Sequence, residues 1–235
     1  MIREIHFLVG LDDLSKHKVE HYLEILLKSY ENFKCNLIHK LVLCFPDDYD
    51  IPNKYLKYNI FRFKYKSKTK CRYDNMYYAV EYLEKIPNTD IFILEPDMVF
   101  TKKYYLFDKK FIDKIHMYST NIDYSSINEV DLKLQFELTS KEYDKLYVFS
   151  GAFFPRKYQD ILKEVLERNE ELNTKYNNTY NLTFVAFYEL LFNDYFNKEN
   201  FSEADYISYN YEKINSEILF MHSKDINILR SSIEK

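Results

Sequence analysis

The chain has 235 residues, of which 46% are hydrophobic and 30% are charged, a balance typical of a globular protein with one sizeable core. Its net charge of −4 gives no global sign of the basic surface with which proteins bind nucleic acids, so we expect no nucleic-acid partner. Tyr and Phe occur 24 and 19 times, whereas Trp is absent and Gly occurs twice. This bias indicates an AT-rich genome rather than an aromatic binding surface.

The cysteines and the N-terminal residues indicate the cellular compartment in which we expect the protein. Cys35, Cys44 and Cys71 show no C-x-x-C spacing and form no even set, so we expect buried, reduced thiols. The first residues lack the layout of a signal peptide, and no window approaches the roughly 20 apolar residues of a membrane helix. We therefore expect a soluble, cytoplasmic protein without a membrane span, from a bacterium, a phage or a large virus; a viral protein would act in the host cytoplasm.

In the first half of the chain, apolar runs alternate with amphipathic segments. Short apolar runs predict buried strands at residues 5–10, 40–45 and 58–63. Apolar residues at helical spacing predict helices at residues 19–30 and 73–86, with an irregular basic segment at 64–72. Such alternation indicates a parallel sheet with helices on both faces, in which ligands bind beyond the carboxyl ends of the strands.

The second half is less regular. Residues 114–143 read as loops and short strands. Further elements are expected as a strand at 148–154, a helix at 155–169, a polar loop at 173–181, a helix at 184–196 and a strand at 218–222. Because no repeat and no linker divides the chain, we expect a single domain over residues 1–235.

An acidic turn interrupts the apolar segment 90–100. Glu95 and Asp97 flank Pro96, which has no N–H and ends strand pairing. Since residues two apart in an extended segment point the same way, both carboxylates can face one ligand. Two oxygen donors on one side suit Mn²⁺ or Mg²⁺, with a diphosphate completing the coordination. An ordinary solvated turn is the alternative interpretation.

Three blocks follow one another in an informative order. Residues 72–76 (RYDNM) lead through a helix into 88–100 (NTDIFILEPDMVF), and residues 150–154 (SGAFF) and 189–193 (ELLFN) follow. Over about residues 70–210 this order resembles the GT-A glycosyltransferases, most closely the retaining family of the histo-blood-group A and B transferases and the α-1,3-galactosyltransferases. That family has an Asp-x-Asp triplet, a small-residue turn before two aromatics, and a Glu-x-x-x-Asn helix.

The chain departs from the family pattern at the triplet and in the late helix. Glu95 and Pro96 replace the first two residues of the triplet, and Tyr188 replaces an acid that usually precedes the family's Glu. The Glu-Pro-Asp version is also similar to that of plant hydroxyproline and serine O-glycosyltransferases.

The resemblance implies an α/β fold of GT-A type, with a Rossmann-like, mixed but mainly parallel sheet flanked by helices. Residues 1–100 would form the nucleotide-binding half, and residues 101–235 the half that binds sugar and acceptor. The implied activity is metal-dependent transfer of a hexose from a nucleotide-diphosphate sugar, with UDP favoured, to a glycan or another hydroxyl acceptor.

The resemblance also implies roles for individual residues. The metal ligands would be Asp97, Glu95 and His222, the last following an apolar strand; Lys224 would neutralise phosphate in the alternative interpretation of that segment. Nucleotide contacts would come from Arg72, Asn75 and Glu95 and, by the position of their loop in the sheet, from Gly10 and Leu11. Sugar and acceptor contacts would come from Ser150, Gly151, Ala152 and Asn193. Glu189 would be the catalytic carboxylate, which supports retention as nucleophile or as stabiliser of an oxocarbenium-like transition state.

Two alternatives remain open. In an inverting GT-A enzyme, an Asp or Glu from residues 123–144 would act as the general base on the acceptor. A non-catalytic transferase-like domain would instead bind carbohydrate or protein, for which the abundant tyrosines are suited.

Overall fold

The structure is a computed structural model that describes the chain in segments. These are residues 4–11, 14–15, 18–33, 39–64, 77–86, 88–101, 113–121, 145–180, 187–195, 201–214 and 218–234. The predictions made for Cys35, Cys71, Arg72, Asn75 and the 123–144 segment lie outside these residues. No helix in the described part is long and apolar enough to cross a membrane.

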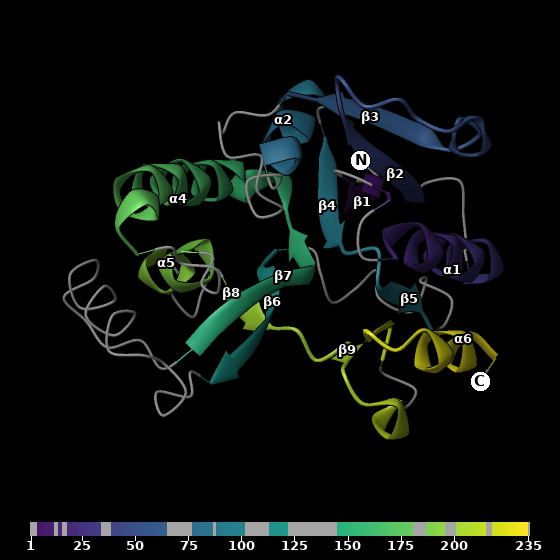
Figure 1. Cartoon of the computed structure of the whole chain (residues 1–235). Coiled ribbons are helices and arrows are strands. Elements are labelled where there is room, and N and C mark those ends of the chain that lie inside the picture. Colours follow the sequence, from purple (N-terminus) through teal and green to yellow (C-terminus); the bar gives the residue numbers. More distant parts are fainter. Residues whose placement is uncertain are drawn as a thin grey trace.

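A seven-stranded sheet forms the centre of the described structure, in the order β3-β2-β1-β4-β7-β6-β8 (Figure 1). Its parallel half consists of β1 (Glu4–Gly10), β2 (His39–Pro46), β3 (Asn59–Phe63) and β4 (Thr89–Leu94). Strands β1, β2 and β4 are runs of buried apolar residues because both faces of the sheet are covered. The three early strands and the first part of the 90–100 strand are therefore confirmed.

In the other half of the sheet, the strands run in mixed directions. Strand β7 (Lys145–Phe154) runs antiparallel to β4, and β6 (Ile115–Asn121) runs antiparallel to β7. The short edge strand β8 (Phe201–Glu203) is parallel to β6. The sheet is thus mixed, with its parallel strands next to one another at one end.

A second, three-stranded sheet has the order β5-β10-β9. It contains β5 (Met98–Phe100), β9 (Ile207–Ser208) and β10 (Phe220–His222), and β10 is antiparallel to β5 and parallel to β9. The segment predicted as one interrupted strand is therefore two strands in two different sheets. The acidic turn lies between them.

Helices cover both faces of the large sheet (Figure 1). On one face, α2 (Tyr77–Lys85), α4 (Gln159–Tyr180) and α5 (Phe187–Tyr195) pack on a core that includes Leu8, Ile91 and Ile93. On the other face, α1 (Val19–Phe33) and the small sheet enclose a second core around Phe7 and Phe92. Helix α6 (Ile226–Glu234) packs against α1 and the small sheet through Leu229.

The main error in the predicted elements lies in the second half of the chain. Helix α4 continues to Tyr180, so the polar loop predicted at 173–181 is wrong. The prediction rested on polarity alone, but this stretch contains neither Gly nor Pro, and a polar sequence without them can continue a helix.

Candidate metal centre

The acidic turn follows β4 at the carboxyl end of the parallel strands. The Met98 N–H donates to the Glu95 carbonyl at 3.1 Å, which closes a four-residue turn over Glu95–Met98. Pro96 occupies the second position of this turn, where its fixed φ is favoured. The reasoning that the two acids alternate along an extended strand is therefore wrong, because a tight turn carries them.

Strand β10 brings His222 to this turn. Because β10 pairs with β5 in the register His222↔Met98, the histidine lies opposite the residue that follows Asp97. The Ser223 N–H donates to the Asp97 carbonyl at 3.2 Å and continues this pairing past the end of the strands. The structure thus joins residues 125 positions apart in sequence.

Three candidate ligand side chains converge here. His222 Nε2 lies 3.2 Å from Asp97 Oδ1 and 3.5 Å from Glu95 Oε2. Lys224 Nζ donates to the other oxygen of Asp97, Oδ2. The Asp97 side chain is only 4% exposed, against 13% for His222 and 22% for Glu95, whereas Lys224 is 66% exposed. Asp97 is therefore a buried carboxylate held between two basic groups.

The charges in this cluster shift the pKa values of its members. Burial alone would raise the pKa of Asp97, but the hydrogen bonds and charges of His222 and Lys224 outweigh burial and hold it well below its usual range. Burial alone would lower the pKa of His222, but its hydrogen bonds with Asp97 and Glu95 outweigh burial and raise it to about 9. In the absence of metal at neutral pH, Asp97 is therefore ionised and His222 is protonated.

The donor set fits a divalent cation. One atom each of Glu95, Asp97 and His222 lie within 4.8 Å of one another, the one such group of potential metal ligands in the described part. Ligands at 2.0–2.1 Å from a metal are roughly 3 Å apart when they are neighbours in an octahedron. The separations of 3.2 and 3.5 Å are close to this value. Carboxylates suit Mg²⁺ and Mn²⁺.

Gly10 and Leu11, the residues predicted to contact nucleotide, end β1 at the same edge of the sheet. A Cβ on Gly10 would lie 2.3 Å from Cε1 of Tyr78, so this glycine allows the buried Tyr78 ring to pack against the strand. The Leu11 side chain is 1% exposed, and its N–H donates to the Cys44 carbonyl at 2.9 Å. Gly10 thus makes room for a buried side chain, and Leu11 continues the backbone pairing of β1 with β2.

The residues predicted to contact sugar lie inside strand β7 rather than in a turn before a helix. Ser150, Gly151 and Ala152 are buried. Gly151 has a φ of +74°, and the register between β6 and β7 shifts at this level, which is a β-bulge. A Cβ on Gly151 would lie 2.5 Å from Ile207 and 3.0 Å from Met98, the residue after Asp97. Gly151 therefore packs directly behind the acidic turn.

Two further predicted residues lie on α5. The Asn193 side chain donates to the Lys145 carbonyl at 2.9 Å and so ties α5 to β7. Glu189 is in the same helix, and its side chain is outside the described part of the structure.

Sequence reasoning missed an aromatic neighbour of the metal centre. The Tyr209 ring lies edge-on to His222 at 4.9 Å between centroids, and Tyr118 packs against Tyr209 at 4.7 Å. Tyr209 is 40% exposed. No local signal distinguishes these two among 24 tyrosines, because their proximity depends on how β6, β9 and β10 are placed.

Comparisons with known proteins place this arrangement in a known fold. No protein-family model matches the sequence, and no curated protein sequence matches it. Solved glycosyltransferase structures, however, match the fold. Mouse xyloside xylosyltransferase 1 in its apo form aligns at a TM-score of 0.57 and 10% identity, covering 94% of this chain and 97% of the mouse chain. The chain has a glycosyltransferase fold.

Two further solved glycosyltransferase structures match the fold. The glycosyltransferase GlyE of Streptococcus pneumoniae TIGR4 aligns at a TM-score of 0.58 and 10% identity over 100% of this chain, which spans 61% of that longer protein. A glycosyltransferase involved in the glycosylation of the major capsid of PBCV-1 aligns at a TM-score of 0.50 and 12% identity, covering 99% of this chain and 100% of the other. The predicted fold class, a mixed sheet with adjacent parallel strands between helical layers, is confirmed.

Proposed function

We propose that this protein is a metal-dependent glycosyltransferase that moves a hexose from a nucleotide-diphosphate sugar to a hydroxyl acceptor. The observation that carries the proposal is the convergence of Glu95, Asp97 and His222 in a glycosyltransferase fold. The cluster lies at the carboxyl end of β4, the position at which open α/β sheets bind their ligands.

Glu95, Asp97 and His222 would hold the divalent cation, which as a Lewis acid supplies stabilisation of the negative charge on a nucleoside-diphosphate leaving group. Mn²⁺ is favoured over Mg²⁺, because an imidazole ligand is less suited to the hard oxygen preference of Mg²⁺. Lys224 holds Asp97 by its Oδ2 atom, which leaves Oδ1 directed at His222. The exposed ammonium group of Lys224 is also suited to binding phosphate.

The order of the elements supports a division of labour. Residues 1–100 contain the parallel strands and the acidic turn, and we assign nucleotide binding to them, with UDP as the favoured nucleotide and Gly10, Leu11, Arg72 and Asn75 as its contacts. Residues 101–235 would bind the sugar and a glycan or other hydroxyl acceptor. The Gly151 bulge in β7 supports this assignment, since it packs against the residue after Asp97.

The proposed retention of the anomeric configuration depends on Glu189. As the carboxylate beneath the sugar it would support retention, either as nucleophile or as stabiliser of developing positive charge. Asn193, one turn further along α5, ties that helix to β7 and would fix its position. A product with inverted anomeric configuration would refute this role for Glu189.

A donor panel tests the function. The purified protein is mixed with Mn²⁺ and each of several sugar nucleotides, and thermal stability and donor hydrolysis are measured. We expect one metal–donor pair to raise the melting temperature and to be hydrolysed slowly. In Asp97→Asn the Mn²⁺-dependent part of that increase should disappear while the circular dichroism spectrum is retained. If no pair stabilises the protein and no donor is hydrolysed, the enzyme hypothesis fails.

A further inference from the structure

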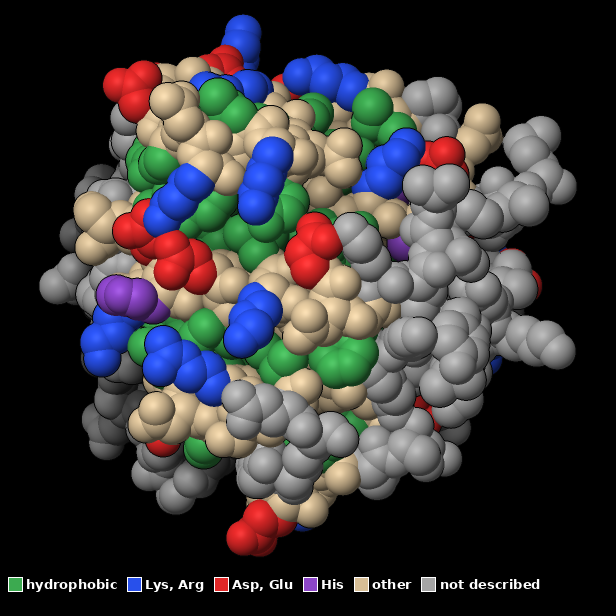
Figure 2. All heavy atoms as spheres, turned by 90° about the vertical axis from the view of Figure 1, so that its right-hand side faces the viewer, with side chains coloured by type: hydrophobic (Ala, Val, Ile, Leu, Met, Phe, Trp, Pro, Cys, Tyr) green, Lys and Arg blue, Asp and Glu red, His purple; other side chains and the backbone are tan. Residues whose placement is uncertain are grey.

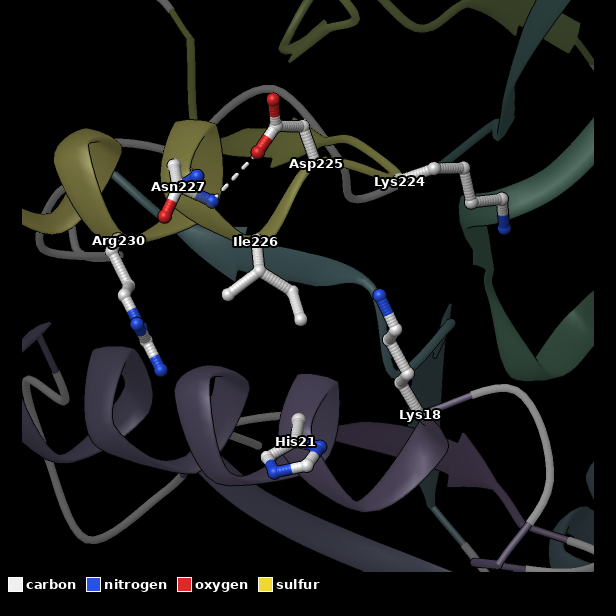
Figure 3. Close-up of a pocket in the computed structure, with 7 residues that line it drawn as sticks. All are labelled: Lys18, His21, Lys224, Asp225, Ile226, Asn227 and Arg230. Atoms are coloured by element: carbon white, nitrogen blue, oxygen red, sulfur yellow. Dashed lines mark hydrogen bonds between the residues drawn. The ribbon is translucent and has the colours of Figure 1, made fainter.

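A hollow of about 790 Å³ opens beside the metal centre, between the first turn of α1 and the start of α6. Its lining residues are Lys18, His21, Lys224, Asp225, Ile226, Asn227 and Arg230. In Figure 3, Lys18 lies directly before α1 and His21 lies on α1, while Ile226 and Arg230 extend from α6 toward α1. We call this hollow the α1–α6 groove.

The groove is lined mainly by basic side chains, although its surroundings are mixed. Figure 2 shows the side of the molecule that carries α1 and α6, where acidic and basic side chains are interspersed. Among the described lining residues, Asp225 is the one acid beside Lys18, Lys224 and Arg230. The Asp225 carboxylate points away from the groove in Figure 3 and accepts the Asn227 N–H at 2.8 Å, which caps α6.

The nearby acids are engaged elsewhere. Glu20 and Glu24 of α1 both pair with Lys54, at 2.7 Å each. Among the described residues no carboxylate lies within ion-pair distance of Lys18, His21 or Arg230. Within that part of the chain Lys18 and Arg230 therefore have no ion-pair partner, and the N-terminal end of the α1 dipole adds to their positive field.

The basic side chains of the groove extend beyond the part that a donor diphosphate at the metal centre would contact. Lys224 lies at the boundary, since it lines the groove and also holds Asp97. Arg230 follows Ile226 by four residues, about 6 Å further along the helix axis, and in Figure 3 it lies at the opposite end of the groove from Lys224. An anion at the metal centre would contact the Lys224 end and leave the Arg230 end free for a second anion.

We propose that the α1–α6 groove binds a phosphate group carried by the acceptor, beside the metal centre at which the donor is held. Ammonium and guanidinium groups on converging helices are the donors that recognise phosphate. The acceptor class is then a phosphorylated glycan or another phosphate ester that carries the reacting hydroxyl. The identification of the ligand as an acceptor rests on the proposed transferase function, whereas the anion site itself does not depend on that function.

The test is calorimetric titration with glycerol 1-phosphate as the probe, on the wild type with Mn²⁺ and with or without saturating UDP. The same titration is made on Lys18→Gln/Arg230→Gln, and on Lys163→Gln as a charge control, because Lys163 lies on α4, across the large sheet. We expect the wild type to bind the probe equally well with and without UDP. Binding to the double variant should be about tenfold weaker, the loss expected for charged hydrogen bonds at an exposed site, and binding to Lys163→Gln should be unchanged.

Each other outcome refutes the proposal. If UDP displaces the probe, the groove serves the phosphates of the donor and not those of an acceptor. If the double variant binds the probe as tightly as the wild type does, or the wild type does not bind it, the groove is not an anion site. Failure of the proposed function is a separate result, because a protein that binds no nucleotide can still be titrated with the probe alone.

Discussion

The affinity of the candidate centre for Mn²⁺ should rise with pH, because His222 must lose its proton before its nitrogen can bind a metal. The neighbouring carboxylates raise the pKa of His222 to about 9. At pH 7, two units below that value, roughly 1% of the imidazoles are neutral, so the apparent affinity is about 100-fold weaker than the intrinsic one. We therefore expect about a tenfold gain in affinity per pH unit between pH 6.5 and 8.5.

Isothermal titration with Mn²⁺ at pH 6.5, 7.5 and 8.5 measures this slope. Repeating each titration in two buffers of different ionisation enthalpy counts the protons released, and close to one per Mn²⁺ is expected at pH 7.5. His222→Asn is the matched control, because an amide retains an oxygen ligand without titrating in this range; its Mn²⁺ affinity should be lower and nearly independent of pH. Equal wild-type affinities at pH 6.5 and 8.5 would refute the assignment of His222 as a protonated partner of Asp97.

Three stability measurements follow from other contacts. The pKa of His222 is about 9 in the folded protein and 6.5 for an unperturbed histidine. Its ion pair should therefore stabilise the metal-free protein by about 3 kcal/mol below pH 6.5. Urea unfolding at a series of pH values should show this stabilisation being lost as the pH rises to 9. Gly151→Ala should lower the free energy of unfolding by about 1–2 kcal/mol because of the φ of +74° at this position. Adding Ile207→Val should restore only the part of the lost stability that is due to the 2.5 Å contact with Ile207. Full restoration would show that φ is not the cause. Ser29→Ala should cost about 1–3 kcal/mol, since the Phe100 N–H donates to Ser29 Oγ at 3.0 Å in the core, and a neutral result would mean that this N–H finds another acceptor.

Part of the candidate site was predictable from the sequence, and part of the reasoning for it was wrong. Glu95 and Asp97 were found because an apolar run that ends in two acids around a proline is unusual within a strand. They face one ligand through a four-residue turn and not through strand alternation. His222 was predicted only through the resemblance and the apolar strand before it, since a single histidine carries no local pattern.

The local sequence by itself determined the early strands, most of the helices and the position of the acidic turn, because hydrophobic periodicity and the missing N–H of Pro96 act over a few residues. Only the tertiary structure decided that His222 and Lys224 meet Asp97, and that Lys18 and Arg230 line one groove. These contacts depend on the pairing of β5 with β10 and on the packing of α6 against α1. Such pairings join segments more than 100 residues apart, and their register is fixed by the complementarity of the packed surfaces rather than by any local pattern.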